Sequence, residues 1–364
     1  MGKKFVSRLL SLVLSAALLL GCLPAAAAAD RSGTQALRFT QTESGETQGD
    51  YLPQSQAEET EASVPYADTD LVRVSIVLKS PSTLEAGYAV ESITESAATQ
   101  AYRSKLRAEQ ETVSQRISHQ VLDGEKLDVV WNLTLAANII SANVRYDQIG
   151  KIESVRGVES VLIENRYEPM VVDQAETNDP NMATSSAQIG SGTAWAAGYT
   201  GAGSRIAVID TGTDTDHISF DGKAFEYSLE QLAADAGKSK DEFVASLDLL
   251  DVDEIAAVLP KLNISKLVPD ASKLYLTSKL PFAFNYVDED FDITHDNDKQ
   301  GEHGSHVAGI ATANRYIATG EDTYGPALEV AHTQGVAPDA QLFTMKVFGK
   351  GGGAYDSDYM AAIE

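Results

Sequence analysis

The chain has 364 residues, of which 43% are hydrophobic, and it carries a formal net charge of −25 at pH 7. A chain of this length has room for about two domains with extensions, and its hydrophobic content is sufficient for buried cores. The negative charge argues against nucleic acid or an anionic membrane surface as a partner, because both repel an acidic protein. It favours solubility and indicates no more specific function.

Residues 1–29 have the pattern of a bacterial-type secretory signal peptide. Basic residues precede an apolar run over residues 9–20 that is too short for a membrane span, and small residues over 25–29 provide a cleavage site. The sequence ending in Cys22 also resembles a lipoprotein cleavage box, in which the cysteine would be acylated. Cleavage near Ala29 is the preferred interpretation, because Leu20 is bulky for that box. We expect a secreted or envelope-associated protein that meets the membrane only through its signal peptide or a lipid on Cys22.

Cys22 is the only cysteine in the chain. The mature protein therefore has no intrachain disulfide, and its stability outside the cell must come from core packing, with bound ions as a further source. Residues 30–69 are rich in Ser, Thr, Gln, Glu and Ala and contain few large apolar groups, which predicts a disordered linker.

Residues 70–168 predict a small α+β domain with a βαββαβ-like order. The expected elements are a strand over 71–78, a helix over 102–121, a strand over 129–135, a helix over 149–155 and a strand over 158–163. The pattern is typical of a ferredoxin-like domain and does not by itself indicate a role. Both helices are expected on one face of the sheet, which leaves the other face free beside a polar, extended exit over 164–168.

An apolar run over 206–209 ends in Asp210-Thr211-Gly212. This triplet also occurs in aspartic peptidases, whose mechanism needs two carboxylates that share one proton. No second Asp-Thr-Gly or Asp-Ser-Gly is present, so that interpretation requires a homodimer. The simplest alternative is an acid that ends a buried strand.

His303 and His306 stand at the start of a predicted helix. Residues three apart share a helical face, so the two histidines are candidate metal ligands. A zincin would show His-Glu-x-x-His, and that glutamate is absent. An acid followed along the chain by a histidine is instead the order Asp, His, Ser of one class of serine hydrolase. In that interpretation His306 is a packed structural residue.

Two further features lie between the acid and the histidines. Residues 221–280 predict a helical insert, with amphipathic segments over 229–232, 247–251 and 255–259. The insert either shapes a substrate cleft or is decorative, and the second is favoured because long surface insertions are well tolerated. The acids of the second feature are candidate calcium ligands, although no EF-hand is present and unpaired surface acids are the favoured alternative. These acids are Asp288, Asp290, Asp292, Asp296 and Asp298.

The C-terminal residues predict a buried strand over 341–348, followed by Gly351-Gly352-Gly353. Glycines at this place let another backbone approach closely, although a flexible loop is an equally simple interpretation. The segment Asp356-Ser357-Asp358 then predicts an N-cap for a helix over 359–364.

Three blocks in this order resemble the subtilisin-like serine peptidases: Val208–Gly212, His303–Gly309 and Gly335–Val347. The long stretch between acid and histidine is similar to the branch that contains lactocepin and C5a peptidase. One departure is Ser305, where the family usually has threonine; both residues are small and hydroxylated.

The resemblance implies a three-layer α/β peptidase domain over 185–364 that is incomplete at its C-terminal side. Asp210 would orient the catalytic His303, and the nucleophilic serine would follow Glu364. Gly351–Gly353 would bind an extended substrate peptide by strand addition. Residues 70–168 would form an inhibitor-I9-type propeptide that acts as an intramolecular inhibitor until it is released within residues 169–184.

These expectations describe the N-terminal part of a secreted serine endopeptidase that acts on proteins, requires no cofactor and is inactive without its serine. The alternative is a non-catalytic protein that serves as an inhibitor, a folding assistant or a peptide-binding pseudoenzyme. Sequence after Glu364 distinguishes them, because the enzyme needs a Gly-Thr-Ser-x-Ala-like block and an oxyanion asparagine.

Overall fold

A computed structural model describes residues 66–169, 182–294, 296, 298 and 301–364. The signal peptide, Cys22 and nearly all of the predicted linker lie outside these residues, and so do residues 170–181 of the predicted maturation region. Within the described part of the chain, no helix is both long and apolar enough to cross a lipid bilayer.

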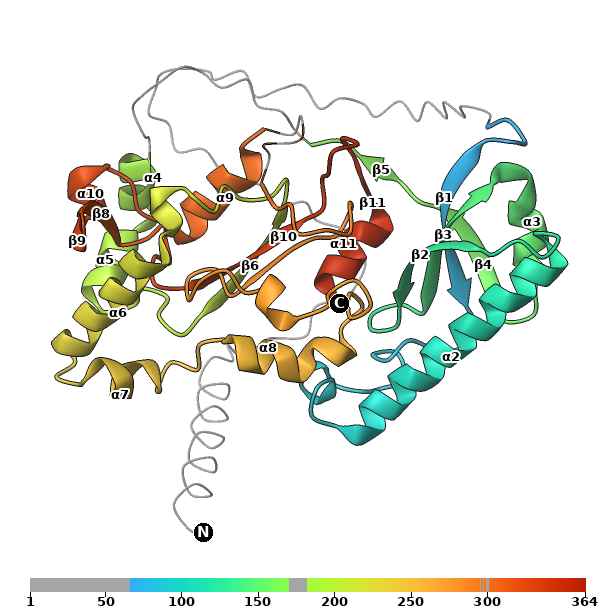
Figure 1. Cartoon of the computed structure of the whole chain (residues 1–364), viewed down its shortest axis with the longest axis horizontal. Coiled ribbons are helices and arrows are strands. Elements are labelled where there is room, and N and C mark those ends of the chain that lie inside the picture. The colour runs from blue at the N-terminus through green and yellow to red at the C-terminus, as the bar shows by residue number, and fades with distance from the viewer. Residues whose placement is uncertain (1–65, 170–181, 295, 297, 299–300) are drawn as a thin grey trace, which may run out of the picture. The chain divides into compact units, whose positions relative to one another are not determined.

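The N-terminal part of the described chain forms a four-stranded antiparallel sheet with two helices (Figure 1). The strand order β2-β3-β1-β4 is that of a ferredoxin-like domain, the class that the sequence predicts, although no strand was predicted at the position of β3. The elements are β1 (Leu71–Leu78), α2 (Ala97–Gln120), β2 (Asp128–Leu133), β3 (Ile139–Arg145), α3 (Ile149–Glu153) and β4 (Val158–Ile163).

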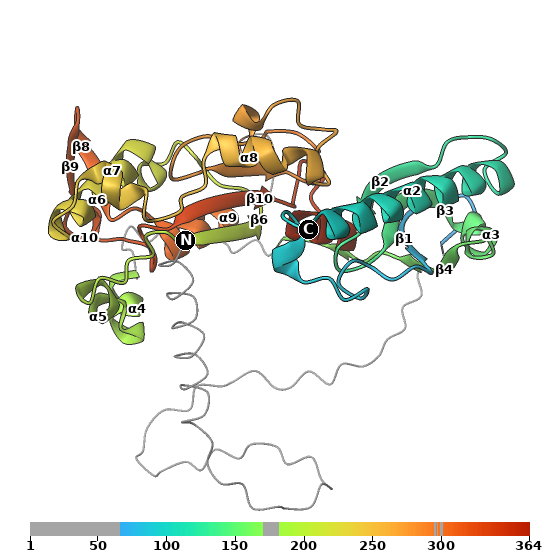
Figure 2. The same cartoon turned by 90° about the horizontal axis from the view of Figure 1, so that it is seen from below.

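Successive side chains of β1 point to opposite faces of this sheet. Val74 and Ile76 are fully buried in a hydrophobic cluster with Val113 of α2 and Ile152 of α3. Both helices therefore cover the same face, as predicted, and α2 runs along the sheet (Figure 2). Residues between these positions, such as Ser75, point to the opposite face, because side chains alternate in a strand.

The C-terminal part contains a parallel sheet with the strand order β6-β10-β7. Its strands are β6 (Arg205–Asp210), β7 (Phe282–Asn285) and β10 (Gln341–Lys346). In the register, Lys346 stands opposite both Asp210 and Asn285. Because the carboxyl ends of parallel strands meet at one edge, this register brings the three polar side chains to the same edge of the sheet.

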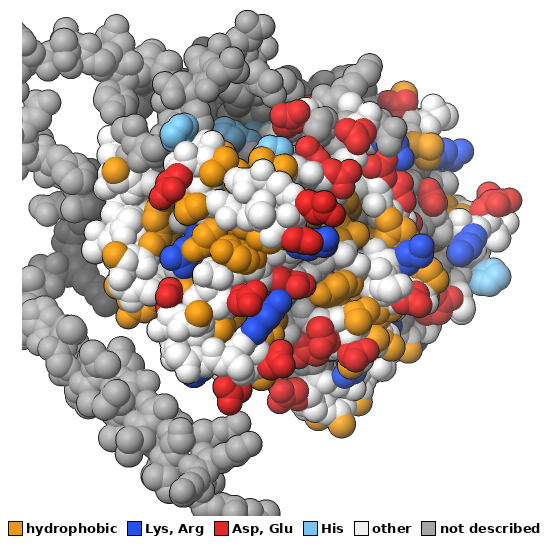
Figure 3. Space-filling model, turned by 60° about the vertical axis from the view of Figure 1, so that its left-hand side comes forward, with side chains coloured by type: hydrophobic (Ala, Val, Ile, Leu, Met, Phe, Trp, Pro, Cys, Tyr) orange, Lys and Arg blue, Asp and Glu red, His pale blue; other side chains and the backbone are white. Residues whose placement is uncertain are grey.

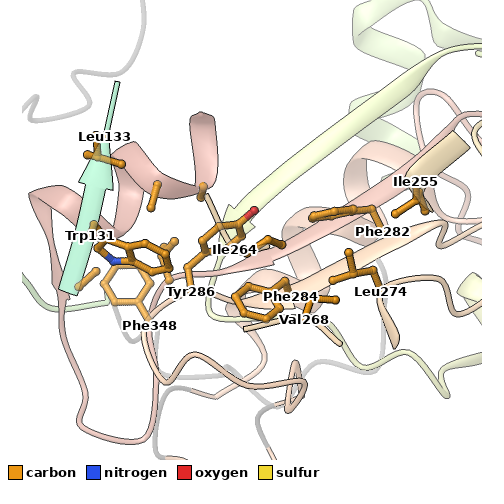
Figure 4. Packing of buried hydrophobic residues seen from close by; sticks show 14 of the residues in the cluster. Trp131, Leu133, Ile255, Ile264, Val268, Leu274, Phe282, Phe284, Tyr286 and Phe348 are labelled. Carbon is orange, nitrogen blue, oxygen red and sulfur yellow. The ribbon is translucent and has the colours of Figure 1, made fainter. Parts of the chain in front are cut away.

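Helices cover both faces of the parallel sheet, which confirms the predicted α/β layers. On one face lies α9 (His303–Thr312), and on the other lies α8 (Val252–Val258) with its neighbouring turns. The cluster under α9 contains Val208, Ala308 and Leu342. The larger cluster under α8 contains Ile255, Phe282 and Phe284 and extends to Trp131 of the N-terminal domain (Figure 4).

The insert between β6 and β7 is mainly helical, as predicted. It contains α6 (Gly222–Asp235), α7 (Lys240–Val244) and α8, with 3₁₀ turns at Leu259–Lys261 and Ala271–Lys273. The predicted helical segment over 247–251 is wrong, because Leu247 and Asp248 lie in a turn and residues 249–251 have no regular secondary structure. Asp248 has a φ of 54°, a backbone conformation that does not continue a right-handed helix. Its carbonyl accepts a 2.6 Å hydrogen bond from Arg205 Nη2 at the start of β6.

Short elements complete the described chain. They are α4 (Met182–Ile189), α5 (Ser191–Ala196), β8 (Tyr316–Gly320), β9 (Thr323–Pro326), α10 (Ala327–Val330), β11 (Ala354–Tyr355) and α11 (Asp356–Ile363). The last helix begins at Asp356 rather than at Tyr359. Asp358 lies in its first turn, where the carboxylate accepts a 2.9 Å hydrogen bond from the backbone N–H of Tyr355.

Acidic side chains are spread over the molecular face shown in Figure 3, where basic side chains are sparser. This distribution agrees with the net charge of −25. The face presents no continuous basic surface of the kind that a polyanion needs.

Candidate active site

Asp210 and His303 meet at the carboxyl edge of the parallel sheet. Asp210 is the last residue of β6 and His303 is the first residue of α9. His303 Nδ1 lies 2.8 Å from Asp210 Oδ1, and the same oxygen accepts a 2.7 Å hydrogen bond from the backbone N–H of Thr211. The Asp210 side chain is 16% exposed and the His303 side chain is 39% exposed. The carboxylate is thus shielded while the imidazole remains accessible.

Glycines allow α9 to start directly against the turn that follows β6. A Cβ at Gly304 would lie 2.1 Å from the carbonyl oxygen of Gly212, and a Cβ at Gly212 would lie 2.2 Å from that of Ile293. Gly212 also has a φ of +108°, which a side chain disfavours. The backbone N–H of Gly304 donates a 2.9 Å hydrogen bond to Thr211 Oγ1. The acid motif and the histidine motif are therefore joined by backbone contacts as well as by their side chains.

Gly304→Ala should destabilise the chain by about 3 kcal/mol or more, because the new methyl group meets backbone that cannot rotate away. Gly309 is the matched control, since it lies in the same helix and a Cβ there meets nothing within 4 Å. Gly309→Ala should be neutral or stabilising by up to about 1 kcal/mol, as expected for glycine replacement inside a helix. Chemical denaturation of the 364-residue chain measures both; equal midpoints for the two variants would contradict the packing argument.

Tyr359 of α11 is a third side chain near the pair. Burial and the negative charge of Asp210 raise the pKa of Tyr359 to about 12. A phenol is neutral near pH 7, and this shift moves its ionisation further from that pH. The ring packs edge-on against Phe348 and Tyr167, with centroid distances of 5.8 and 5.7 Å. No local motif marked Tyr359, because its environment is assembled from distant segments.

His306 is exposed, so its interpretation as a packed histidine is wrong. It lies on the solvent side of α9, one turn from His303. Among the residues with described positions, no group of three or more His, Cys, Asp or Glu side chains is arranged to hold a metal ion.

Four of the five candidate calcium ligands, Asp288, Asp290, Asp292 and Asp298, are engaged by nitrogen donors, so the expectation of unpaired acids is wrong for these four. Asn285 Nδ2 donates a 3.1 Å hydrogen bond to Asp290 Oδ1, and Lys350 Nζ lies 3.4 Å from the other oxygen of that carboxylate. Asp298 is buried with Lys346, and both side chains are 1% exposed. These partners use oxygens that a calcium ion would need as ligands.

The chain that leaves the N-terminal domain pairs with an edge beside the predicted substrate-binding glycines Gly351–Gly353. Its strand β5 (Arg166–Tyr167) runs antiparallel to β11. Arg166 Nη2 donates a 3.0 Å hydrogen bond to the carbonyl oxygen of Gly351, and a Cβ at Gly353 would lie 2.5 Å from Arg166 Nε. The glycines thus allow the tail to approach closely. The backbone pairing itself is made by Ala354 and Tyr355, directly after the glycines.

Asp356 holds the same tail by its carboxylate. One oxygen accepts a 2.9 Å hydrogen bond from the Tyr167 hydroxyl, and the other accepts a 2.8 Å bond from the backbone N–H of Asn165. The bond to this carboxylate raises the pKa of Tyr167. The sequence indicated Asp356 only as a helix cap, and it contains no local signal for partners about 190 residues away.

The free face of the N-terminal sheet packs on both ends of α11. At the first end, the Glu164 carboxylate accepts a 2.9 Å hydrogen bond from Ser75 Oγ and a 2.7 Å bond from Ser357 Oγ. After the last turn, Glu364 Oε2 accepts a 2.9 Å bond from the backbone N–H of Thr134. The domain therefore contacts the helix that carries Tyr359 through buried carboxylates.

A carboxylate and an imidazole at the carboxyl edge of a parallel sheet, in this chain order, are typical of one class of hydrolase. Residues 201–364 match the Subtilase family, Peptidase S8. This part of the chain is similar to a subtilase domain.

The relatives of the chain are named as proteinases. It is 33% identical over 213 residues to a PII-type proteinase of Lacticaseibacillus paracasei, an alignment that covers 58% of this chain and 9% of that protein. A PII-type proteinase of Lactococcus lactis subsp. cremoris is 32% identical over the same shares of both chains. The minor extracellular protease Vpr of Bacillus subtilis (strain 168) is 26% identical over 306 residues, with 80% of this chain and 27% of that protein aligned. The chain thus spans only a small part of the relatives that it matches.

Proposed function

We propose that residues 185–364 are the N-terminal part of the catalytic domain of a serine endopeptidase. Asp210 and His303 would be two members of its triad, and the nucleophilic serine would come from sequence that follows Glu364. The single observation that carries this proposal is the 2.8 Å separation of His303 Nδ1 and Asp210 Oδ1 within residues that match the Subtilase family.

The geometry supports a proton-transfer role for His303. Asp210 accepts the Nδ1 proton, which leaves Nε2 unprotonated and able to take a proton from a serine hydroxyl as that oxygen attacks a peptide carbonyl. The carboxylate then stabilises the imidazolium, and His303 returns the proton to the leaving amine. Thr211 N–H holds the carboxylate in place through its 2.7 Å hydrogen bond.

A fluorophosphonate probe, which reacts only with an activated serine, tests this function. The chain ending at Glu364 should remain unlabelled, because it lacks the proposed nucleophile. A form extended through the downstream serine should be labelled at that residue. Stoichiometric labelling at a serine within residues 1–364 would overturn the assignment, and an unlabelled extended form would favour the non-catalytic alternative.

We further propose that residues 70–168 are an inhibitory propeptide, joined through residues 169–184 to the peptidase domain. The pairing of β5 with β11 supports this role, because it places the departing tail beside Gly351–Gly353. A peptide substrate would use the same edge, since strand addition needs mainly backbone hydrogen bonds. The tail would therefore exclude substrates until it is cut.

The proposed protein is exported, with proteins or peptides as substrates. Its N-terminal sequence and its similarity to a protease named as extracellular support this location. Lipidation at Cys22 is the alternative to cleavage near Ala29. No resident cofactor enters the proposed reaction, and no calcium site is assigned to the aspartates.

A further inference from the structure

The insert between β6 and β7 contacts the N-terminal domain through residues 259–263, which we call the insert tip. Lys261 Nζ donates a 2.9 Å hydrogen bond to the carbonyl oxygen of Thr94. In the opposite direction, Arg107 Nη2 of α2 donates a 3.0 Å bond to the carbonyl oxygen of Lys261. Each side of the contact thus contributes one cation and one backbone acceptor.

The insert tip is held in place by the helix that the N-terminal domain also contacts. Asn263 Nδ2 donates a 2.8 Å hydrogen bond to the carbonyl oxygen of Ala361 in α11. Arg103 lies one turn from Arg107 on α2 and forms an ion pair with Glu364, just after α11. One face of α2 therefore contacts two elements of the peptidase part, the end of α11 and the insert tip.

The two hydrogen bonds of this contact differ in exposure. The bond from Arg107 to the Lys261 carbonyl is partly buried, and burial together with the charge of Arg103 lowers the pKa of Arg107. A cation that loses water requires a hydrogen-bond acceptor, so loss of the Lys261 carbonyl as a partner would be costly for Arg107. The bond from Lys261 to the Thr94 carbonyl is exposed and adds less. Pro260 adds rigidity to the 3₁₀ turn that presents the Lys261 carbonyl.

We propose that the insert tip is a recognition element by which the peptidase part selects its own N-terminal domain. The ladder between β5 and β11 can be made by many extended segments, so it gives little selectivity. An N-terminal domain without a donor at position 107 leaves the Lys261 carbonyl without that bond. This inference rests on the proposed propeptide role, and it gives the insert a binding function in place of the favoured decorative interpretation.

The test uses the 364-residue chain with a site-specific protease sequence placed within residues 170–181. After cleavage of the folded chain, the dissociation constant of the two fragments is measured by dilution with a fluorescent N-terminal fragment. Arg107→Met should weaken binding roughly five- to twentyfold, as expected for loss of one hydrogen bond from a partly buried cation. Lys261→Met should weaken it by less, roughly two- to fivefold, because the bond from Lys261 to Thr94 is exposed.

Two matched controls separate this effect from a general loss of charge. Arg116 lies on the same helix but bonds to Arg156 within the N-terminal domain, and Lys266 is exposed on the insert. Arg116→Met and Lys266→Met should leave binding unchanged within about twofold, since neither loses a contact across the interface. Circular dichroism of each uncut variant checks that the fold is retained.

A third arm distinguishes this inference from the function on which it rests. Tyr167→Phe removes the hydroxyl that bonds to Asp356 and should weaken binding whether or not the insert tip takes part. If Tyr167→Phe weakens binding while Arg107→Met and Lys261→Met do not, the insert tip is not a recognition element and the propeptide proposal stands. If the unmodified fragments separate freely after cleavage, the propeptide proposal fails and this inference fails with it.

Discussion

Replacing His303 by alanine should lower kcat by about 10⁶ in a form of the protein that contains the downstream serine, the magnitude known for the histidine of subtilisin-type triads. The variant loses the base that we propose takes the serine proton. Its 39% exposed side chain contributes little to packing, so the folded population should remain unchanged. Hydrolysis of a fluorogenic peptide measures kcat, and thermal denaturation checks the fold.

His306→Ala is the matched control, because His306 lies on the same helix and is exposed. Its kcat should equal that of the unmodified protein. We also propose that the protein cuts its own chain within residues 169–184 with the same catalytic base. The His303→Ala protein should then retain its N-terminal domain covalently. Normal maturation of this variant in a host without other peptidases would contradict self-processing.

Asp210→Asn should reduce kcat by about 10⁴ while preserving the shape of the site. Oδ1 of Asp210 is the atom that faces both Thr211 N–H and His303 Nδ1. An amide nitrogen in that position loses the bond from Thr211 N–H and donates to Nδ1, which places the imidazole proton on Nε2, the atom that must accept the serine proton. The substitution also removes the negative charge that stabilises the imidazolium.

Asp216→Asn provides the control for removal of a nearby acid. Asp216 is exposed and follows the same turn, but it does not bond to His303. Its kcat should stay within about twofold of the unmodified value, as for surface substitutions in general. Equal losses for the two variants would mean that Asp210 acts through net charge rather than by orienting the imidazole.

The sequence predicted elements whose pattern is local. β1 and β4 have the bounds that alternation indicates, because each has one face buried by α2 and α3. The strand β7 gave no such pattern, since all four of its residues are buried. A strand that is buried on both faces has a continuous apolar sequence, and periodicity cannot distinguish such a run from a buried helical segment.

The site was predictable as two motifs in order, but its supports were not. Asp210 and His303 stand in recognisable segments, and the glycine beside His303 indicates a close approach. Lys346 and Lys350 meet the aspartate run from 48 and 60 residues away, and no periodicity within that run signals them. No local pattern signals the partners of Asp356 either, because Asn165 and Tyr167 lie in or next to β5, about 190 residues away.

The contacts at the two ends of α11 have a consequence for the order of events during synthesis. Ser75 and Glu164 close the N-terminal sheet over 89 residues, and Ser357, the other partner of Glu164, follows 193 residues later. At about 5–20 residues per second, translation of the interval from Glu164 to Ser357 takes roughly 10–40 s. The N-terminal domain has its own hydrophobic cluster and can form during this interval. The residues of α11 then emerge opposite a surface that is already folded, with the Glu164 carboxylate in place to receive Ser357.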